Sequence, residues 1–129
     1  MKRVVIINMK NYIFADAVAQ VLQADEQSGF QVTRTTSTEE LLQQSKLFEP
    51  YAVLMEVNGF PPYVLEERLK IRNAVKAVNP DCKIVLVVDE NSEKEIAEEV
   101  REAKKAGRID QFIYGSISSS YLVALMDTL

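Results

Sequence analysis

The sequence predicts one α/β domain, residues 1–129, in which helices cover both faces of a parallel sheet. The chain is 47% hydrophobic and 26% charged, a balance typical of a single globular domain. Short β-branched or apolar runs alternate five times with segments whose apolar residues recur at helical spacing. Regular strand–helix alternation favours parallel strands joined by right-handed crossovers.

Composition excludes several kinds of function. The chain contains no histidine, which rules out histidine acid–base catalysis, histidine metal ligands and phosphohistidine chemistry. A net charge of −4 argues against non-specific binding of nucleic acid. The one cysteine, Cys82, cannot form an internal disulfide and is interpreted as structural. The apolar run Val4–Ile7 is too short for a signal peptide or a membrane span, so we expect a cytoplasmic protein without membrane contact.

In the first half of the chain, turn and cap residues separate the expected elements. A buried strand at Val4–Ile7 precedes a helix that ends near Ser28, and Phe30–Thr35 alternates like a second strand. Ser37 and Glu40 form a capping box that opens a helix through about Phe48. Pro50 stops that helix.

The second half repeats the pattern three times. We expect a strand at Tyr51–Glu56, followed by a helix at Tyr63–Val78 whose buried stripe consists of Leu65, Leu69, Val75 and Val78. A strand at Lys83–Val88, covered on both faces, precedes a helix that a second capping box opens at Ser92 and Glu95 and that Gly107 closes. The last two elements are a strand at Phe112–Tyr114 and a helix capped by Ser118 or Ser119.

Three segments carry a resemblance to a known family. "PYAVLMEV" covers the third strand, "NPDCKIVLVV" the fourth, and "AKKAGRIDQFIY" the approach to the fifth. With the five strand–helix units, they resemble the receiver domain of bacterial response regulators over nearly the whole chain. The resemblance implies a three-layer, flavodoxin-like sandwich with strand order 2-1-3-4-5 and a role in two-component signalling.

The resemblance also implies where a phosphorylation site should lie. In the family, two acids after the first strand hold Mg²⁺ and an aspartate ending the third strand accepts the phosphoryl group. A Thr or Ser ending the fourth strand and a Lys ending the fifth contact that group. The matching positions here are Asn8 and Met9, Glu56 with Asn58 two residues on, Val88, and Gly115 or Tyr114. Only Glu56 keeps the charge type, which predicts a receiver that does not take phosphate by the usual route.

Glu56 has three interpretations at this stage. It imitates a phosphorylated aspartate, or it pairs with Lys10, Asn8 or a backbone N–H, or it binds a metal together with Asn8 and the carbonyl of Asn58. We predict no catalytic residue, no metal site and no cofactor. Phe112 matches the aromatic that rotates during signalling in the family, or it is a buried strand residue.

The leading hypothesis is therefore a degenerate, non-enzymatic receiver in a bacterial two-component-type or transcriptional system that works by protein–protein contact. A phospho-accepting regulator with an unusual site and a small-molecule binder of the same fold are the alternatives. The last helix carries more apolar residues than one packed face requires. We expect an interface, such as a homodimer, through the helix that follows Ser92, the fifth strand and the last helix. Its expected residues are Tyr114, Tyr121, Val123 and Met126.

Overall fold

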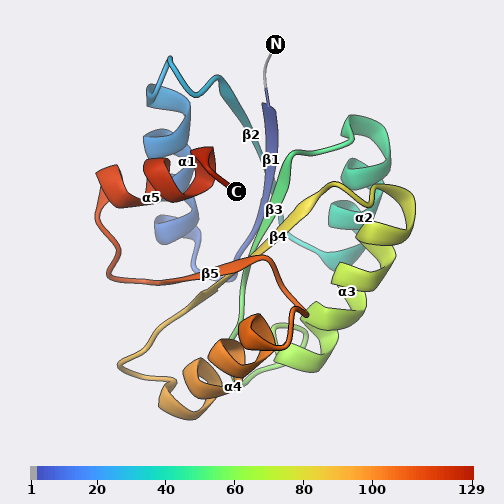
Figure 1. The fold of residues 1–129 in the computed structure, drawn as a ribbon, viewed down its shortest axis with the longest axis vertical. Helices are drawn as coiled ribbons and strands as arrows, with labels where there is room; N and C mark the ends of the chain where they lie inside the picture. Colours follow the sequence, from blue (N-terminus) through green and yellow to red (C-terminus); the bar gives the residue numbers. More distant parts are fainter. Residues whose placement is uncertain (1–2) are drawn as a thin grey trace.

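The computed structural model describes residues 3–129, which form five strands and five helices in strict alternation (Figure 1). The elements are β1 (Arg3–Asn8), α1 (Tyr12–Ala24), β2 (Phe30–Thr35), α2 (Thr38–Phe48), β3 (Ala52–Glu56), α3 (Leu65–Val78), β4 (Lys83–Val88), α4 (Lys94–Lys105), β5 (Gln111–Tyr114) and α5 (Ser119–Asp127). The predicted alternation is confirmed, and most boundaries agree within one or two residues.

The strands of residues 3–129 form one parallel sheet in the order β2-β1-β3-β4-β5, as the resemblance implied. In the register, Asn8 lies beside Met55, and Val88 lies beside Tyr114. Because all strands run the same way, the ends of β1, β3, β4 and β5 meet at one edge of the sheet. This edge holds the residues that the resemblance matches to the family's phosphorylation site, Asn8, Met9, Glu56, Asn58, Val88 and Gly115. We refer to them as the remnant positions.

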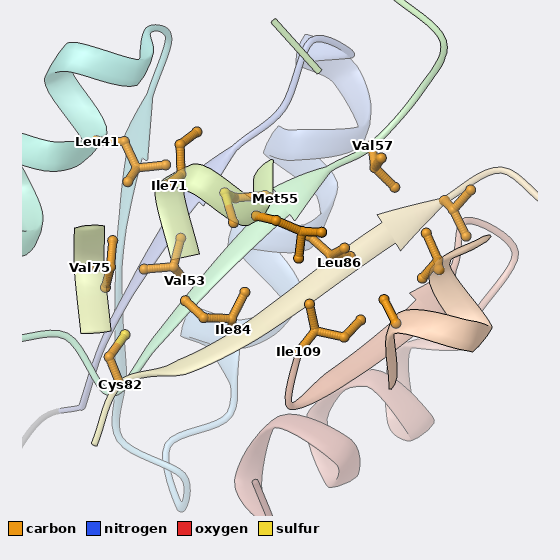
Figure 2. Packing of buried hydrophobic residues seen from close by; sticks show 14 of the residues in the cluster. Leu41, Val53, Met55, Val57, Ile71, Val75, Cys82, Ile84, Leu86 and Ile109 are labelled. Atoms are coloured by element: carbon orange, nitrogen blue, oxygen red, sulfur yellow. The ribbon is translucent and has the colours of Figure 1, made fainter. Parts of the chain in front are cut away.

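Two apolar layers hold the helices to the sheet. α1 and α5 cover one face, and α2, α3 and α4 cover the other (Figure 1). Side chains of β3 and β4 meet residues of α2 and α3 on the second face (Figure 2). Val85 and Val87 face the first layer, whereas Ile84 and Leu86 face the second. The prediction that β4 is covered on both faces is confirmed.

Several predicted helix ends are confirmed by their caps. The Ser37 hydroxyl accepts the N–H of Glu40 at 3.1 Å, and the Glu40 carboxylate accepts the N–H of Thr36 at 2.8 Å. Ser118, not Ser119, caps α5. After α4, Gly107 has φ of 75°, and the next N–H, of Arg108, donates to the carbonyl of Ala103. A glycine suits this turn because it has no Cβ to strain at positive φ.

The second capping box was wrong. α4 begins at Lys94, and Glu93 stands at its N-cap without a side-chain bond. Ser92 instead donates its N–H to the carboxylate of Asp89 at 3.3 Å, and Asn91 does the same at 2.9 Å. The backbone N–H of Asn91, with Ser92, lowers the pKa of Asp89. The Asp89 carboxylate, just after β4, therefore accepts the backbone N–H groups of this turn.

One further boundary and one residue of a predicted buried stripe differ from the prediction. α1 ends at Ala24, four residues before Ser28, because residues up to Gly29 form a turn in which the Ser28 hydroxyl binds Asp25. In α3, Val78 is 55% exposed and does not belong to the buried stripe.

Cys82 is fully buried, and burial raises the pKa of its thiol to about 12, as fits a structural residue. No helix within residues 3–129 combines the length and apolarity needed to cross a lipid bilayer.

Candidate functional site

The Glu56 side chain is held at the edge of the sheet by three donors. Its Oε1 accepts the backbone N–H of Lys10 at 2.9 Å and of Asn11 at 3.1 Å, and its Oε2 accepts the amide of Asn58 at 2.9 Å. Two of these donors belong to the loop between β1 and α1, which crosses above the end of β3. Both carboxylate oxygens are therefore engaged by the protein itself.

Asn58 fixes the loop that follows β3. Its side-chain oxygen accepts the N–H of Phe60 at 2.8 Å, and its own N–H donates to the carbonyl of Tyr63 at 3.0 Å. With its oxygen directed to Phe60, its side-chain amide nitrogen donates to Glu56. The remnant positions Glu56 and Asn58 thus form one unit through a bond between their side chains. The bond from the Phe60 N–H to the Asn58 side chain is the local arrangement typical of Asn in turns.

Arg68 of α3 is a buried cation beside this unit, and the sequence analysis missed it. Its side chain is 1% exposed. Nε donates to the carbonyl of Glu56 at 2.7 Å, Nη1 to Oδ1 of Asn8 at 3.0 Å, and Nη2 to the carbonyl of Asn8 at 3.1 Å. The guanidinium carbon also lies 4.9 Å from the ring centre of Tyr63. This planar set of donors joins the ends of β1 and β3.

Burial lowers the pKa of the Arg68 guanidinium to about 10, while Tyr63 and the Glu56 carboxylate oppose that shift. The group therefore remains charged at neutral pH. A signal for this residue existed in the sequence, because Arg68 falls between Leu65 and Ile71 on the helical spacing of the buried stripe. An arginine at such a position must find acceptors inside the protein.

Asn8 faces Arg68 and β2 instead of Glu56. Its amide donates to the hydroxyl of Thr35 at 3.0 Å and to the carbonyl of Ser37 at 3.1 Å, while its Oδ1 accepts from Arg68. The Thr35 hydroxyl in turn donates to the carbonyl of Ile7. Both polar atoms of the Asn8 side chain are thus satisfied away from the Glu56 carboxylate.

The other remnant positions offer no polar side chain. Met9 is 7% exposed and packs among the residues beneath α1 and α5. Val88 is 1% exposed and packs on the opposite layer. Gly115 follows β5 and donates its N–H to the carbonyl of Val88 at 3.1 Å. The structure brings Glu56, Asn58 and Gly115 to one cleft, whereas Met9 and Val88 do not line it.

That cleft has a volume of about 690 Å³ and opens at the carboxyl ends of the strands. Phe14 and Phe60 contribute apolar surface, and Lys10 lies 5.2 Å from the centre of the Phe60 ring. The charges along the cleft are mostly negative: Glu56, Asp89, Glu90 and Glu93 against Lys10. Within residues 3–129, no group of three or more acidic, cysteine or histidine side chains is arranged to hold a metal ion.

The aromatic residues of β5 form a pair. Phe112 is half-buried against the α2–α3–α4 layer, and its ring lies edge-on to Tyr114 with centres 5.6 Å apart. The Tyr114 hydroxyl accepts a hydrogen bond from Arg101 of α4 at 2.8 Å. Tyr114 is therefore tied to α4 and only partly accessible.

The expected interface residues of α5 differ in exposure. Tyr121 is 58% exposed and Val123 is half-buried. Met126 is fully buried, so its assignment to an interface was wrong. The reason is that α5 turns Leu122 and Met126, one helical turn apart, toward the sheet.

Comparison with solved structures identifies the fold. The receiver domain of AraT, a response regulator from Geobacillus stearothermophilus, has a TM-score of 0.76 at 14% identity, over 99% of this chain and 95% of that one. A CheY-like receiver domain protein from Methanospirillum hungatei has a TM-score of 0.74 at 15% identity, over 99% and 93%. The CheY-like protein TadZ from Pseudomonas aeruginosa has a TM-score of 0.72 at 17% identity, over 98% of each chain.

No family model matches the chain, and no curated relative matches its sequence. At these identities the structural likeness concerns the fold. The chain has the fold of response regulator receiver domains over nearly its full length, and the predicted resemblance is confirmed at that level.

Proposed function

We propose that this chain is a degenerate receiver, a non-catalytic signalling module that works by protein–protein contact and does not accept a phosphoryl group by the usual receiver route. One observation carries the proposal. The residue at the acceptor position, Glu56, has both carboxylate oxygens bound by Lys10, Asn11 and Asn58. An acid held in this way is a satisfied structural group.

The chemistry of the neighbouring positions supports the proposal. A divalent cation prefers carboxylate oxygens, and phosphoryl transfer needs donors or cations on the transferred oxygens. Asn8 provides an amide and Met9 a thioether after β1, while Val88 and Gly115 provide neither hydroxyl nor ammonium after β4 and β5. Of the five side-chain functions that the family uses, the two Mg²⁺-binding acids, the hydroxyl and the lysine are missing, and only the acid at the acceptor position remains.

The same contacts favour one interpretation of Glu56 over the other two. As an imitation of a phosphorylated aspartate, it would need a hydroxyl or a lysine to read its charge, and Val88 and Gly115 supply neither. As a metal ligand beside Asn8, it would need the oxygen that Asn8 directs to Arg68. As a satisfied acid, it needs only the three donors it has.

The proposal places the module in the cytoplasm of a bacterial cell, within a two-component-type or transcriptional regulatory system. The net charge of −4 favours a protein partner over direct nucleic-acid contact. The surface formed by α4, β5 and α5, with exposed Tyr121 and half-buried Tyr114 and Val123, is the proposed contact face, including a homodimer.

Intact mass spectrometry after incubation with acetyl phosphate and Mg²⁺ tests the loss of phosphoryl transfer. We expect no stoichiometric gain of a phosphoryl group by the wild type or by Glu56→Asp, because the four other positions remain unchanged. A receiver with a complete acidic site serves as the positive control. Mg²⁺-dependent phosphorylation of the wild type, lost in Glu56→Gln, would instead establish a phospho-accepting regulator with an unusual site.

The cleft at the carboxyl ends of the strands favours a second candidate function, binding of a small ligand. Sites of this kind are common where α/β sheets end. With negative charge on Glu56 and Asp89 and aromatic surface on Phe60, such a ligand would be a cationic or amine-bearing compound. A thermal-shift series with such compounds tests it. A shift abolished by Phe60→Ala and kept in Phe48→Ala, a remote exposed phenylalanine, would support this function.

A further inference from the structure

A groove separate from the remnant site runs between α3 and α4. It has a volume of about 960 Å³. Its apolar lining comes from Val64 and Leu65 at the start of α3 and from Ala103 and Ala106 near the end of α4. Figure 1 shows this end of α3 beside α4, away from the α5 surface. The groove is an apolar trough on the side of the molecule.

Acidic side chains surround this apolar lining. Five glutamates line the groove, Glu66 from α3 and Glu95, Glu98, Glu99 and Glu102 from α4, against two cations, Lys94 and Arg108. The four α4 residues share one side of the helix because they are spaced by three or four positions. The groove therefore carries an excess of negative charge around an apolar centre.

Most of this charge is not neutralised within the described part of the chain. Glu98 pairs with Arg101 at 2.8 Å, and Glu102 lies 3.6 Å from Lys105. No ion pair among residues 3–129 involves Glu66, Glu95 or Glu99. All three are exposed, so their carboxylates are accessible to a partner.

We propose that the α3–α4 groove docks a basic amphipathic segment of a partner protein. Its apolar side chains would cover half-buried Val64 and Leu65 and exposed Ala106, and its Lys or Arg residues would face Glu95 and Glu99. Charge complementarity sets this choice, since acidic peptides, nucleic acids and anionic membranes are repelled by the same rim. The inference rests on the proposed protein-contact function and gives it a specific partner chemistry.

A synthetic helical peptide of about 15 residues, with Leu on one face and Lys on both flanks, is a suitable probe. We would measure its binding by fluorescence anisotropy. Two control peptides carry Glu in place of Lys or Ser in place of Leu. The expected result is binding of the basic amphipathic peptide that weakens with salt, and much weaker binding of both control peptides.

The protein variants separate groove binding from general attraction. Glu95→Gln with Glu99→Gln removes two charges from the rim, and both side chains are exposed. Glu26→Gln with Glu39→Gln removes the same charge elsewhere on the surface. We expect the first pair to weaken binding about tenfold, roughly 1.4 kcal/mol, and the second pair to change it by less than about twofold.

Three results would overturn the inference: no binding of the basic peptide, equal loss in both double variants, or equal binding of the Ser-containing peptide. Amide shift mapping adds an independent readout, with the largest changes expected at Leu65, Ala103 and Ala106. A failed docking test leaves the mass-spectrometric test of the proposed function unaffected, and phosphorylation of Glu56 would leave the docking result standing. The two ideas can therefore fail separately.

Discussion

The guanidinium of Arg68 donates two hydrogen bonds to Asn8, one to its side-chain oxygen at 3.0 Å and one to its main-chain carbonyl at 3.1 Å. A third donor of the same group reaches the carbonyl of Glu56. A residue from α3 thus joins the ends of the neighbouring strands β1 and β3. An asparagine suits this position because its amide also supplies a donor to Thr35.

Removing this cation should destabilise the fold. Arg68→Met keeps an unbranched side chain that can fill most of the buried path, but it deprives Asn8 and Glu56 of three hydrogen bonds inside the protein. We expect a loss of about 2–4 kcal/mol, because each unpaired buried polar group costs about 1–3 kcal/mol. The measurement is the urea midpoint at unchanged slope. Lys70→Met, on the exposed side of the same helix, is the matched control and should shift stability by less than about 0.5 kcal/mol.

Arg68→Lys separates charge from geometry. An ammonium keeps the charge but lacks the planar fork that reaches three acceptors at once, so it should recover only part of the loss. Full recovery would show that the charge alone matters, and the hydrogen-bond account of Arg68 would then be wrong.

Glu56→Gln tests how firmly the acid is held. In the wild type, the Asn58 amide donates to Oε2 of Glu56. The substitution removes the negative charge and places a second amide opposite that donor. Hydrogen bonds to a charged group are worth about 1.5–3 kcal/mol, so we expect a loss of about 2 kcal/mol in chemical unfolding. Glu26→Gln, on the exposed turn after α1, should be neutral. Stabilisation by Glu56→Gln would mean that the acid is strained.

Asp110 should contribute a pH-dependent part of the stability. Partial burial would raise the pKa of its carboxyl, but the Ile84 N–H at 2.8 Å and the Lys76 ammonium at 2.9 Å outweigh burial, and the pKa falls below its ordinary 3.8. The folded state then binds fewer protons than the unfolded state. This contribution is therefore present above about pH 4 and is lost as the pH falls through the folded-state pKa.

Asp110→Asn makes that contribution measurable. At pH 7 the variant should be less stable than the wild type by about 1 kcal/mol, and near pH 3 the difference should shrink. Urea unfolding at both pH values is the measurement, with Asp81→Asn, an exposed aspartate, as the control. A difference that is constant with pH would contradict the assigned role of the Asp110 carboxylate.

Self-association through α5 can be tested with residues that the structure leaves accessible. Tyr121→Glu with Val123→Glu replaces the exposed and half-buried apolar side chains and spares buried Met126. In sedimentation velocity, we expect the wild type to associate with rising concentration and the double variant to remain monomeric. A wild type that stays monomeric at high micromolar concentration would remove the homodimer.

Local patterns sufficed to predict the type and order of the elements along the chain, because their signals do not depend on distant residues. The apolar run of β4 must be covered on both faces, and the Ser37 capping box begins a helix wherever the chain goes next. The errors arose where two local donors or acceptors competed. Before α4, the Asp89 carboxylate accepts the N–H of Ser92, which therefore does not act as the cap. After α1, Asp25 accepts the Ser28 hydroxyl in a turn, so the helix ends before Ser28.

The site was only partly predictable. Glu56, Asn58 and Gly115 meet at one cleft because strand order brings their loops together, and strand order followed from the resemblance. The partners of Glu56 are backbone N–H groups of Lys10 and Asn11, which no side-chain pattern encodes. Arg68 lies twelve residues after Glu56 on another element, so its contact with Asn8 depends on tertiary packing.

A cation that is a side chain differs from a dissolved ion in one respect. Arg68 is covalently part of α3, so its stoichiometry beside Asn8 is fixed at one for one, and neither a chelator nor a change in cellular magnesium can exchange it. On the proposed function, the cation beside Asn8 therefore stays in place for the lifetime of each molecule. The strength of its signal would then depend on how many copies of the module the cell contains and on how its partners compete for them.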